Sequence, residues 1–200
     1  RNPWWSATSW PPSSPDPKGD LMVYLFLANG FEEVEAIATL DVIRRANIEI
    51  RSVSIGAKEI TGSHGITVIC DMTDSDVNEL DIDGVILPGG MPGTLNLQKN
   101  SYVQKAIDYA LSNDKYLCAI CAAPLILGQK EILKDKKATC YPGFESDLIG
   151  AEVTGGFVEA DGKIITAKGA GVAIDFALKI VEKLKNKEAA DKINASIQSK

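Results

Sequence analysis

Residues 115–123, with the sequence KYLCAICAA and Pro124 directly after them, decide how the rest of the chain is organised. Residues 116–120 form an apolar run rich in strand formers, and the run stops at Cys121. Two alanines and the proline then open a helical stretch, residues 125–129. A strand, an abrupt turn and a helix are typical of a nucleophile elbow, where backbone N–H groups and the helix end favour a thiolate. The local pattern fits equally well with Cys121 as a small packing residue.

The composition indicates one globular domain. The chain has 200 residues, of which 45% are hydrophobic and 24% charged, and this length suits one well-packed domain better than two. A net charge of −6 argues against nucleic acid or an anionic membrane as the main partner. The apolar runs are about six to eight residues long, whereas a membrane-spanning helix needs roughly 20. Four unevenly spaced cysteines do not form a disulfide scaffold, so we expect a reducing, cytoplasmic setting.

Residues 1–21 differ in composition from the rest of the chain. They hold all three tryptophans and five of the nine prolines, without strand or helix periodicity. We interpret them as an expression leader, with the native start at Met22. The alternative is a proline-rich docking arm. The single domain is then predicted to span residues 22–200.

From Met22 onward the pattern alternates between strands and helices, which predicts an α/β fold. The near-continuous apolar run 22–28 is typical of a parallel strand buried on both faces, and a helical crossover links it to a second strand. Further strands and helices follow, and Asp161-Gly162 marks a hairpin turn. We expect a doubly wound, mostly parallel sheet between helices, with a small antiparallel ribbon. The predicted strands are 22–28, 48–56, 84–87, 116–120, 138–141, 157–160 and 163–167, with 59–61 and 66–70 as an accessory hairpin. The predicted helices are 32–46, 102–111, 125–129, 145–149, 172–184 and 188–197, and residues 71–83 are expected to form a helical turn and a loop.

Three segments are expected at the carboxyl edge of this sheet, where such folds bind ligands. They are residues 29–35, 88–93 and 121–124. Gly89 and Gly90 let backbone N–H groups approach a bound oxyanion, and the N–H of Ala122 lies one residue past the cysteine. Gly90 and Ala122 are therefore candidates for an oxyanion hole, with Gly89 as an accessory. A tight turn explains the two glycines equally well.

Three glutamates crowd the start of the first predicted helix. Carboxylates are favoured there by the helix dipole, which is a sufficient reason for two of them. A catalytic role requires one that faces inward. Periodicity alone leaves the choice among Glu32, Glu33 and Glu35 open.

Four motifs, in order and spacing, resemble the ThiJ/PfpI superfamily, in the branch of the Parkinsonism-associated deglycase and its bacterial chaperone-like relatives. They are ANGFEEVE (28–35), LPGG (87–90), AICAAP (119–124) and KGAGVAIDFA (168–177). The resemblance implies a flavodoxin-like, usually dimeric protein with Cys121 as an easily oxidised thiol. It also implies that Glu35 is protonated and hydrogen-bonds the sulfur, since a desolvated carboxyl beside an anion has a raised pKa.

The chain departs from that family at two positions. Many members carry a histidine where this chain has Tyr141, and the peptidase branch has a histidine where it has Ala122. The only histidine, His64, lies in a predicted turn and is interpreted as a surface or interface residue. A Cys-His dyad for peptide hydrolysis is therefore poorly supported. Tyr141 stays a possible accessory residue.

The remaining cysteines carry weaker signals. Cys118 and Cys121 form a Cys-x-x-Cys motif, but Cys118 lies inside the strand rather than at a helix start, which argues against dithiol redox chemistry. Cys70 and Cys140 are interpreted as packed thiols. With one histidine and no second close cysteine pair, we predict no metal site and no cofactor.

The leading hypothesis is a glyoxalase- or deglycase-like enzyme acting on small α-oxoaldehydes or early glycation adducts through a hemithioacetal at Cys121. The rival hypothesis is a redox-sensing or chaperone-like protein whose Cys121 is oxidised to sulfinate. The expected partners are small carbonyl substrates or glycated proteins, and a second copy of the chain. Neither a membrane nor nucleic acid is expected.

Overall fold

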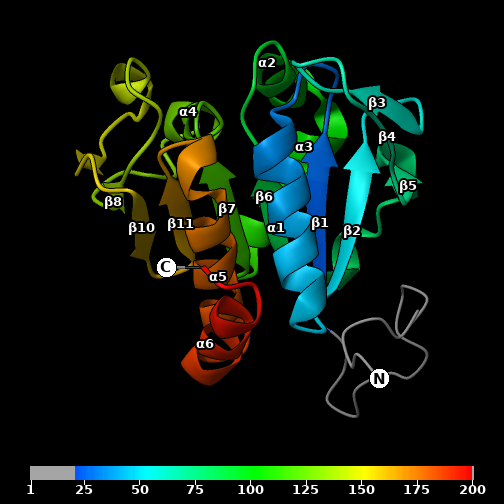
Figure 1. The fold of residues 1–200 in the computed structure, drawn as a ribbon. Coiled ribbons are helices and arrows are strands. Elements are labelled where there is room, and N and C mark those ends of the chain that lie inside the picture. Colours follow the sequence, from blue (N-terminus) through cyan, green and yellow to red (C-terminus); the bar gives the residue numbers. More distant parts are fainter. Residues whose placement is uncertain (1–20, 200) are drawn as a thin grey trace, which may run out of the picture.

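A seven-stranded sheet organises the protein (Figure 1). The structure is a computed structural model, and it describes residues 21–199. The strand order is β10-β11-β7-β6-β1-β2-β5, and every neighbouring pair is parallel except β10 and β11. These strands are β1 (Met22–Leu27), β2 (Glu49–Ser54), β5 (Met72–Thr73), β6 (Ile82–Leu87), β7 (Tyr116–Ile120), β10 (Val158–Asp161) and β11 (Ile164–Ala167). This confirms the predicted doubly wound sheet and its antiparallel ribbon.

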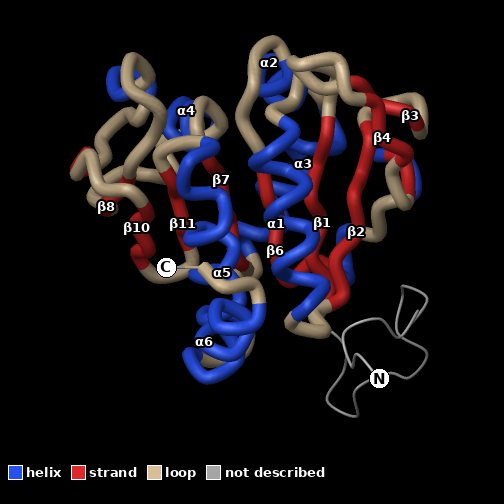
Figure 2. Tube along the Cα trace, viewed as in Figure 1, coloured by secondary structure: helices blue, strands red, loops and turns tan. Residues whose placement is uncertain are grey.

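Two small sheets lie outside the main one (Figure 2). β3 (Glu59–Thr61) and β4 (Thr67–Ile69) form the predicted antiparallel hairpin. β8 (Lys137–Ala138) pairs with β9 (Glu152–Val153) in parallel. At the sheet edges, β5 leads into a 3-10 turn, and β9 comes shortly before β10 in the chain.

The helices divide between the two faces of the main sheet. On one face, α1 and α5 pack against inward side chains such as Leu25 and Ile165, and α6 packs against α5. On the other, α2, α3 and α4 pack against side chains such as Phe26 and Leu117. The helices are α1 (Glu33–Arg45), α2 (Gly93–Lys99), α3 (Ser101–Ser112), α4 (Pro124–Gln129), α5 (Ala173–Leu184) and α6 (Lys187–Ser196). Successive side chains of β1 point to opposite faces of the sheet, and helices cover both faces, which explains why its sequence is apolar throughout.

Several sequence-based boundaries were wrong. The segment 71–83 contains the edge strand β5 as well as two 3-10 turns, because two residues are too few to show strand periodicity. The strand predicted at 138–141 ends at Ala138, since the next N–H group of Thr139 is taken by the Thr166 side chain. α2 and β9 were not predicted, and 145–149 is a 3-10 turn rather than a helix.

Of residues 1–21, which we interpret as a leader, the structure describes Leu21. The other residues of this segment lie outside the described part of the chain. Between residues 21 and 199, no helix combines the length and the apolarity that crossing a bilayer would require.

A matched pair of substitutions in α3 tests the core assignment. Ile107 is fully buried against the sheet, whereas Leu111, one turn later, is half exposed. Ile107→Ala should therefore lower the free energy of unfolding by about 2–5 kcal/mol because it leaves a cavity, and Leu111→Ala by about 0.5 kcal/mol. Urea denaturation measures both. Equal losses would show that this face of α3 is not packed as described.

Candidate active site

Cys121 occupies a sharp turn between β7 and α4, as the elbow pattern predicts. Its φ is +64°, in the left-handed region that non-glycine residues rarely adopt. Both of its backbone groups are held: its N–H donates to the Ala167 carbonyl at 2.9 Å, and its carbonyl accepts from the Tyr141 N–H at 2.8 Å. The surrounding strands therefore fix an otherwise unfavourable backbone conformation and with it the direction of the sulfur.

Glu35 reaches the same point from α1. Its side chain is 1% exposed, and Oε2 accepts a hydrogen bond from the Gly89 N–H at 2.8 Å. The Gly89 carbonyl accepts from the Glu32 N–H at 2.9 Å, so the end of β6 is bound to the start of α1 by both backbone groups. Of the three candidate glutamates, Glu35 is the one that contacts the Cys121 side chain.

Gly89 has to be a glycine here. A Cβ at this position would lie 2.6 Å from the Cβ of Cys121 and 2.8 Å from Oε2 of Glu35, closer than atoms can approach. The predicted accessory residue therefore provides the space in which cysteine and glutamate meet.

The N–H groups of Gly90 and Ala122 both point at the Cys121 sulfur and lower the pKa of its thiol. The structure thus places the two predicted oxyanion donors where the sequence expects them. Tyr141 also lies at the site, because its N–H binds Cys121 and its ring packs on Gly169. Its side chain is half exposed, and no contact between its hydroxyl and the sulfur is present.

The charges of Cys121 and Glu35 depend on each other. Burial raises the pKa of Glu35 to about 7, although the Gly89 hydrogen bond opposes this, and the charge of Glu32 adds to the rise. Burial and the negative charge of Glu35 raise the pKa of the Cys121 thiol to about 12. The sulfur therefore does not ionise beside a charged Glu35, and the six-residue helix α4 is not sufficient to make it do so.

The unbonded oxygen of Glu35 indicates where the proton belongs. Oε1 is buried and receives no hydrogen bond from residues 21–199, and an acceptor without a donor is costly in a buried site. A proton on Glu35 removes this cost and gives the sulfur a donor in place of a negative neighbour. The pair can then hold its single negative charge on sulfur, facing the N–H groups of Gly90 and Ala122.

Comparison with known proteins agrees with this geometry. The sequence profile of the DJ-1/PfpI family matches residues 22–183. The chain belongs to the DJ-1/PfpI family. This confirms the resemblance drawn from the four motifs.

Relatives within the DJ-1/PfpI family are similar over most of the chain. Protein DJ-1 homolog A of Arabidopsis thaliana is 33% identical over 86% of this chain and 45% of its own length. A deglycase of Pyrococcus horikoshii is 36% identical over 66% of this chain and 80% of its own. The structure of oxidised Toxoplasma gondii DJ-1 superposes with a TM-score of 0.86 at 32% identity, covering 90% and 98% of the two chains. The chain spans less than half the length of the two Arabidopsis relatives it matches.

The other three cysteines of this DJ-1/PfpI protein are packed thiols. Cys70, Cys118 and Cys140 are buried and free, whereas Cys121 is partly exposed. Burial raises the pKa of Cys70 and of Cys140 to about 11, and it also raises that of Cys118. Cys118 lies within β7, as predicted, so the Cys-x-x-Cys motif does not present two accessible thiols.

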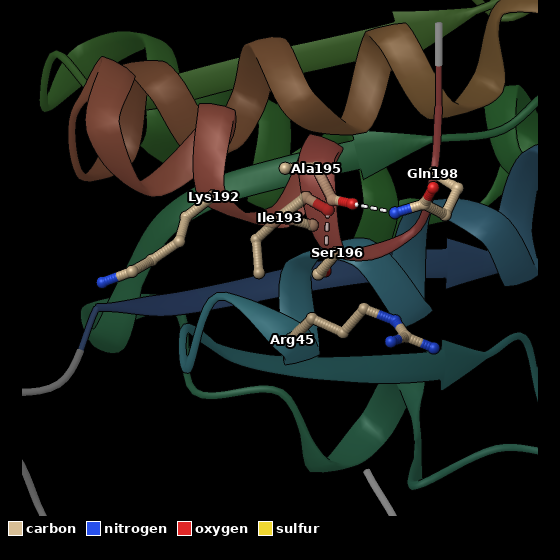
Figure 3. Close-up of a pocket in the computed structure, with 6 residues that line it drawn as sticks. All are labelled: Arg45, Lys192, Ile193, Ala195, Ser196 and Gln198. Atoms are coloured by element: carbon tan, nitrogen blue, oxygen red, sulfur yellow. Dashed lines mark hydrogen bonds between the residues drawn. The ribbon is translucent and has the colours of Figure 1, made fainter. Parts of the chain in front are cut away.

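A separate pocket of about 540 Å³ lies between α6 and the end of α1 (Figure 3). It is lined by Arg45, Lys192, Ile193, Ala195, Ser196 and Gln198. Ser196 and Gln198 donate their hydrogen bonds to backbone carbonyls of α6 itself. None of the predicted site residues lines this pocket.

The raised pKa of Glu35 predicts a pH-dependent stability. The folded state binds more protons than the unfolded state between the unfolded pKa of 4.5 and the folded value of about 7, so the free energy of unfolding should fall as pH rises through this window. In wild type the free energy of unfolding should fall by about 3 kcal/mol across this window. In Glu35→Gln this fall should be absent, because glutamine does not titrate. Urea denaturation at a series of pH values measures this.

Glu188→Gln, at an exposed position of α6, is the matched control and should keep the wild-type slope. An identical slope in Glu35→Gln and wild type would mean that Glu35 is ionised in the folded protein throughout this range.

Proposed function

We propose that this protein is a cysteine-dependent enzyme without a cofactor, acting on small α-oxoaldehydes or early glycation adducts. The observation that carries the proposal is the buried Glu35 carboxyl, which contacts the Cys121 side chain, while the N–H groups of Gly90 and Ala122 also face the sulfur. The kinship with a protein named deglycase supports this reaction class. A peptidase function has no support, because the only histidine, His64, contacts Glu32 and Glu33 rather than Cys121.

The reaction starts with addition of the Cys121 thiolate to the aldehyde carbon. The S–C bond forms as the carbonyl π pair moves to oxygen, and the N–H groups of Gly90 and Ala122 stabilise the resulting oxyanion. Glu35 gives this oxygen its proton, which yields a hemithioacetal and leaves a carboxylate. That carboxylate then removes the C1 proton to give an enediol and returns it at C2, while the C1 hydroxyl proton passes to the C2 oxygen, which gives the lactoyl thioester. Water hydrolyses the thioester, so methylglyoxal plus water becomes lactate.

Two features of the structure suit small substrates. Cys121 is only partly exposed, and the sulfur lies among the tightly packed backbone of Gly89 and Gly90. Tyr141 holds the position at which the family resemblance implies a histidine, and without a second proton carrier there we expect weak turnover.

The enzyme hypothesis predicts how two variants respond. Cys121→Ser should abolish methylglyoxal turnover, and Glu35→Gln should lower it about 10²- to 10⁴-fold, as expected for loss of a general acid-base group. Lactate formation followed by NMR is the measurement. Cys70→Ala, which changes a packed thiol between β4 and β5, should retain activity in proportion to its folded fraction. Unchanged turnover in Cys121→Ser would refute the mechanism.

A second candidate function is redox sensing through Cys121. Only this cysteine of the four is partly exposed, and its flanking N–H groups would also stabilise a sulfinate. Mild peroxide treatment followed by mass spectrometry should therefore show oxidation at Cys121 and not at Cys70, Cys118 or Cys140. Selective oxidation combined with negligible methylglyoxal turnover would favour the sensor, and equal oxidation of all four thiols would exclude it.

A homodimer is part of the proposal. Val34 and Ile37 on α1 and Ile66 and Ile69 on the β3–β4 hairpin are large apolar side chains that lie exposed. Ile37 and Ile69 line a common pocket, so the two elements form a joint surface. Exposed apolar surface of this kind is typical of protein interfaces, and a second copy of the chain is the partner we expect.

A further inference from the structure

Glu32, Glu33 and His64 meet on the surface beside the β3–β4 hairpin, away from the sulfur of Cys121. The two glutamates lie at the start of α1, and His64 lies in the hairpin loop. His64 Nδ1 is 2.9 Å from Oε2 of Glu33 and 3.5 Å from Oε2 of Glu32. One ligand atom from each of the three side chains lies within 4.8 Å of the others.

The two distances from Nδ1 match those between ligands around one transition-metal ion. Bonds from zinc to imidazole nitrogen and carboxylate oxygen are about 2.0–2.2 Å, so two ligands at octahedral to tetrahedral angles lie about 2.9–3.5 Å apart. A cation can therefore take the place of the proton between Nδ1 and the carboxylates with little movement of the ligands. The Ser63 hydroxyl, 3.1 Å from Nδ1 and 3.4 Å from each carboxylate, offers a further oxygen.

Glu33 is held so that one oxygen faces this cluster. Its Oε1 accepts the backbone N–H of His64 at 2.8 Å and that of Ile66 at 3.4 Å. Gly62 packs directly on the carboxyl, because a Cβ there would lie 2.3 Å from it. Oε2 of Glu33 faces the side chains of His64 and Ser63. Outer hydrogen bonds that orient a ligand in this way are a regular feature of metal sites.

Independently of the distances, the charge of the cluster calls for a cation. The Glu33 side chain is 6% exposed, yet within residues 21–199 neither glutamate has a lysine or arginine within ion-pair distance. Their sole cationic neighbour is His64, which is charged only when protonated.

We propose that Glu32, Glu33 and His64 form a binding site for a divalent transition-metal ion of the zinc class. The ligands are Nδ1 of His64 and one oxygen from each glutamate. An imidazole nitrogen with two carboxylates suits zinc better than magnesium or calcium, which prefer all-oxygen sites with more ligands. The His64 side chain is 68% exposed in the single chain, beside the apolar side chains of Val34 and Ile66.

Calorimetric titration of the full chain with zinc chloride tests the site. We expect one equivalent to bind to wild type and also to Cys121→Ser, which removes the competing accessible thiol. His64→Asn and Glu32→Gln should each weaken binding at least about tenfold. Glu59→Gln, an exposed carboxylate on the same hairpin, is the matched control and should bind as wild type does.

A second readout identifies the ligand atom. His64 is the only histidine of the chain, so long-range ¹H–¹⁵N correlation spectra report on it alone, and zinc should shift Nδ1 rather than Nε2. Wild-type affinity in His64→Asn and Glu32→Gln, loss of binding in Cys121→Ser, or no saturable binding would overturn the proposal. Thermal unfolding without zinc checks that the variants are folded. Aldehyde turnover is not a readout, so the result is independent of the proposed enzyme function.

Discussion

The backbone of Gly89 is the joint on which the candidate active site depends. Its N–H binds the carboxyl of Glu35 and its carbonyl binds the N–H of Glu32, so the end of β6 and the start of α1 cannot move apart. The absent side chain leaves the space in which Cys121 and Glu35 approach each other. A buried carboxyl whose Oε1 accepts no hydrogen bond from residues 21–199 is tolerated because these contacts hold it in place and because that oxygen can carry a proton.

The parallel sheet explains why residues so distant in sequence meet at this joint. β1, β6 and β7 are consecutive in the sheet, and their carboxyl ends lead into α1, Gly89 and Cys121 respectively. The left-handed backbone of Cys121 is then stabilised from the other side by Ala167, the last residue of β11, and by Tyr141. Strain at the cysteine is thus balanced by hydrogen bonds from neighbouring chain segments, and the sulfur points toward Glu35 as a result of the topology.

The sequence predicted the elements that carry strong periodicity and missed those that do not. β1 and β7 are continuous apolar runs, and α5 has one apolar face, so their type followed from the residues. β5 has two residues and is defined by its pairing with β2, which no local pattern reveals. At the site, Cys121 and Ala122 followed from the elbow and Gly90 from the glycine pair after the strand 84–87, whereas Glu35 was selected by family resemblance. The cluster at His64 was missed because its members lie about 30 residues apart and each has an ordinary local explanation.

Glu33 and Glu35 show why periodicity alone could not identify the glutamate that adjoins the cysteine. They lie in the same helical turn and are both almost fully buried. Glu33 accepts hydrogen bonds from His64 and Ile66, which lower its pKa to about 2 despite burial. For Glu35, burial outweighs the hydrogen bonds from the Gly89 N–H and the Cys121 thiol, and its pKa rises to about 7. The first is thus kept as a carboxylate, suited to hold a cation, and the second is able to carry a proton next to a sulfur. The number of donors that the fold supplies, rather than the residue type, separates the two roles.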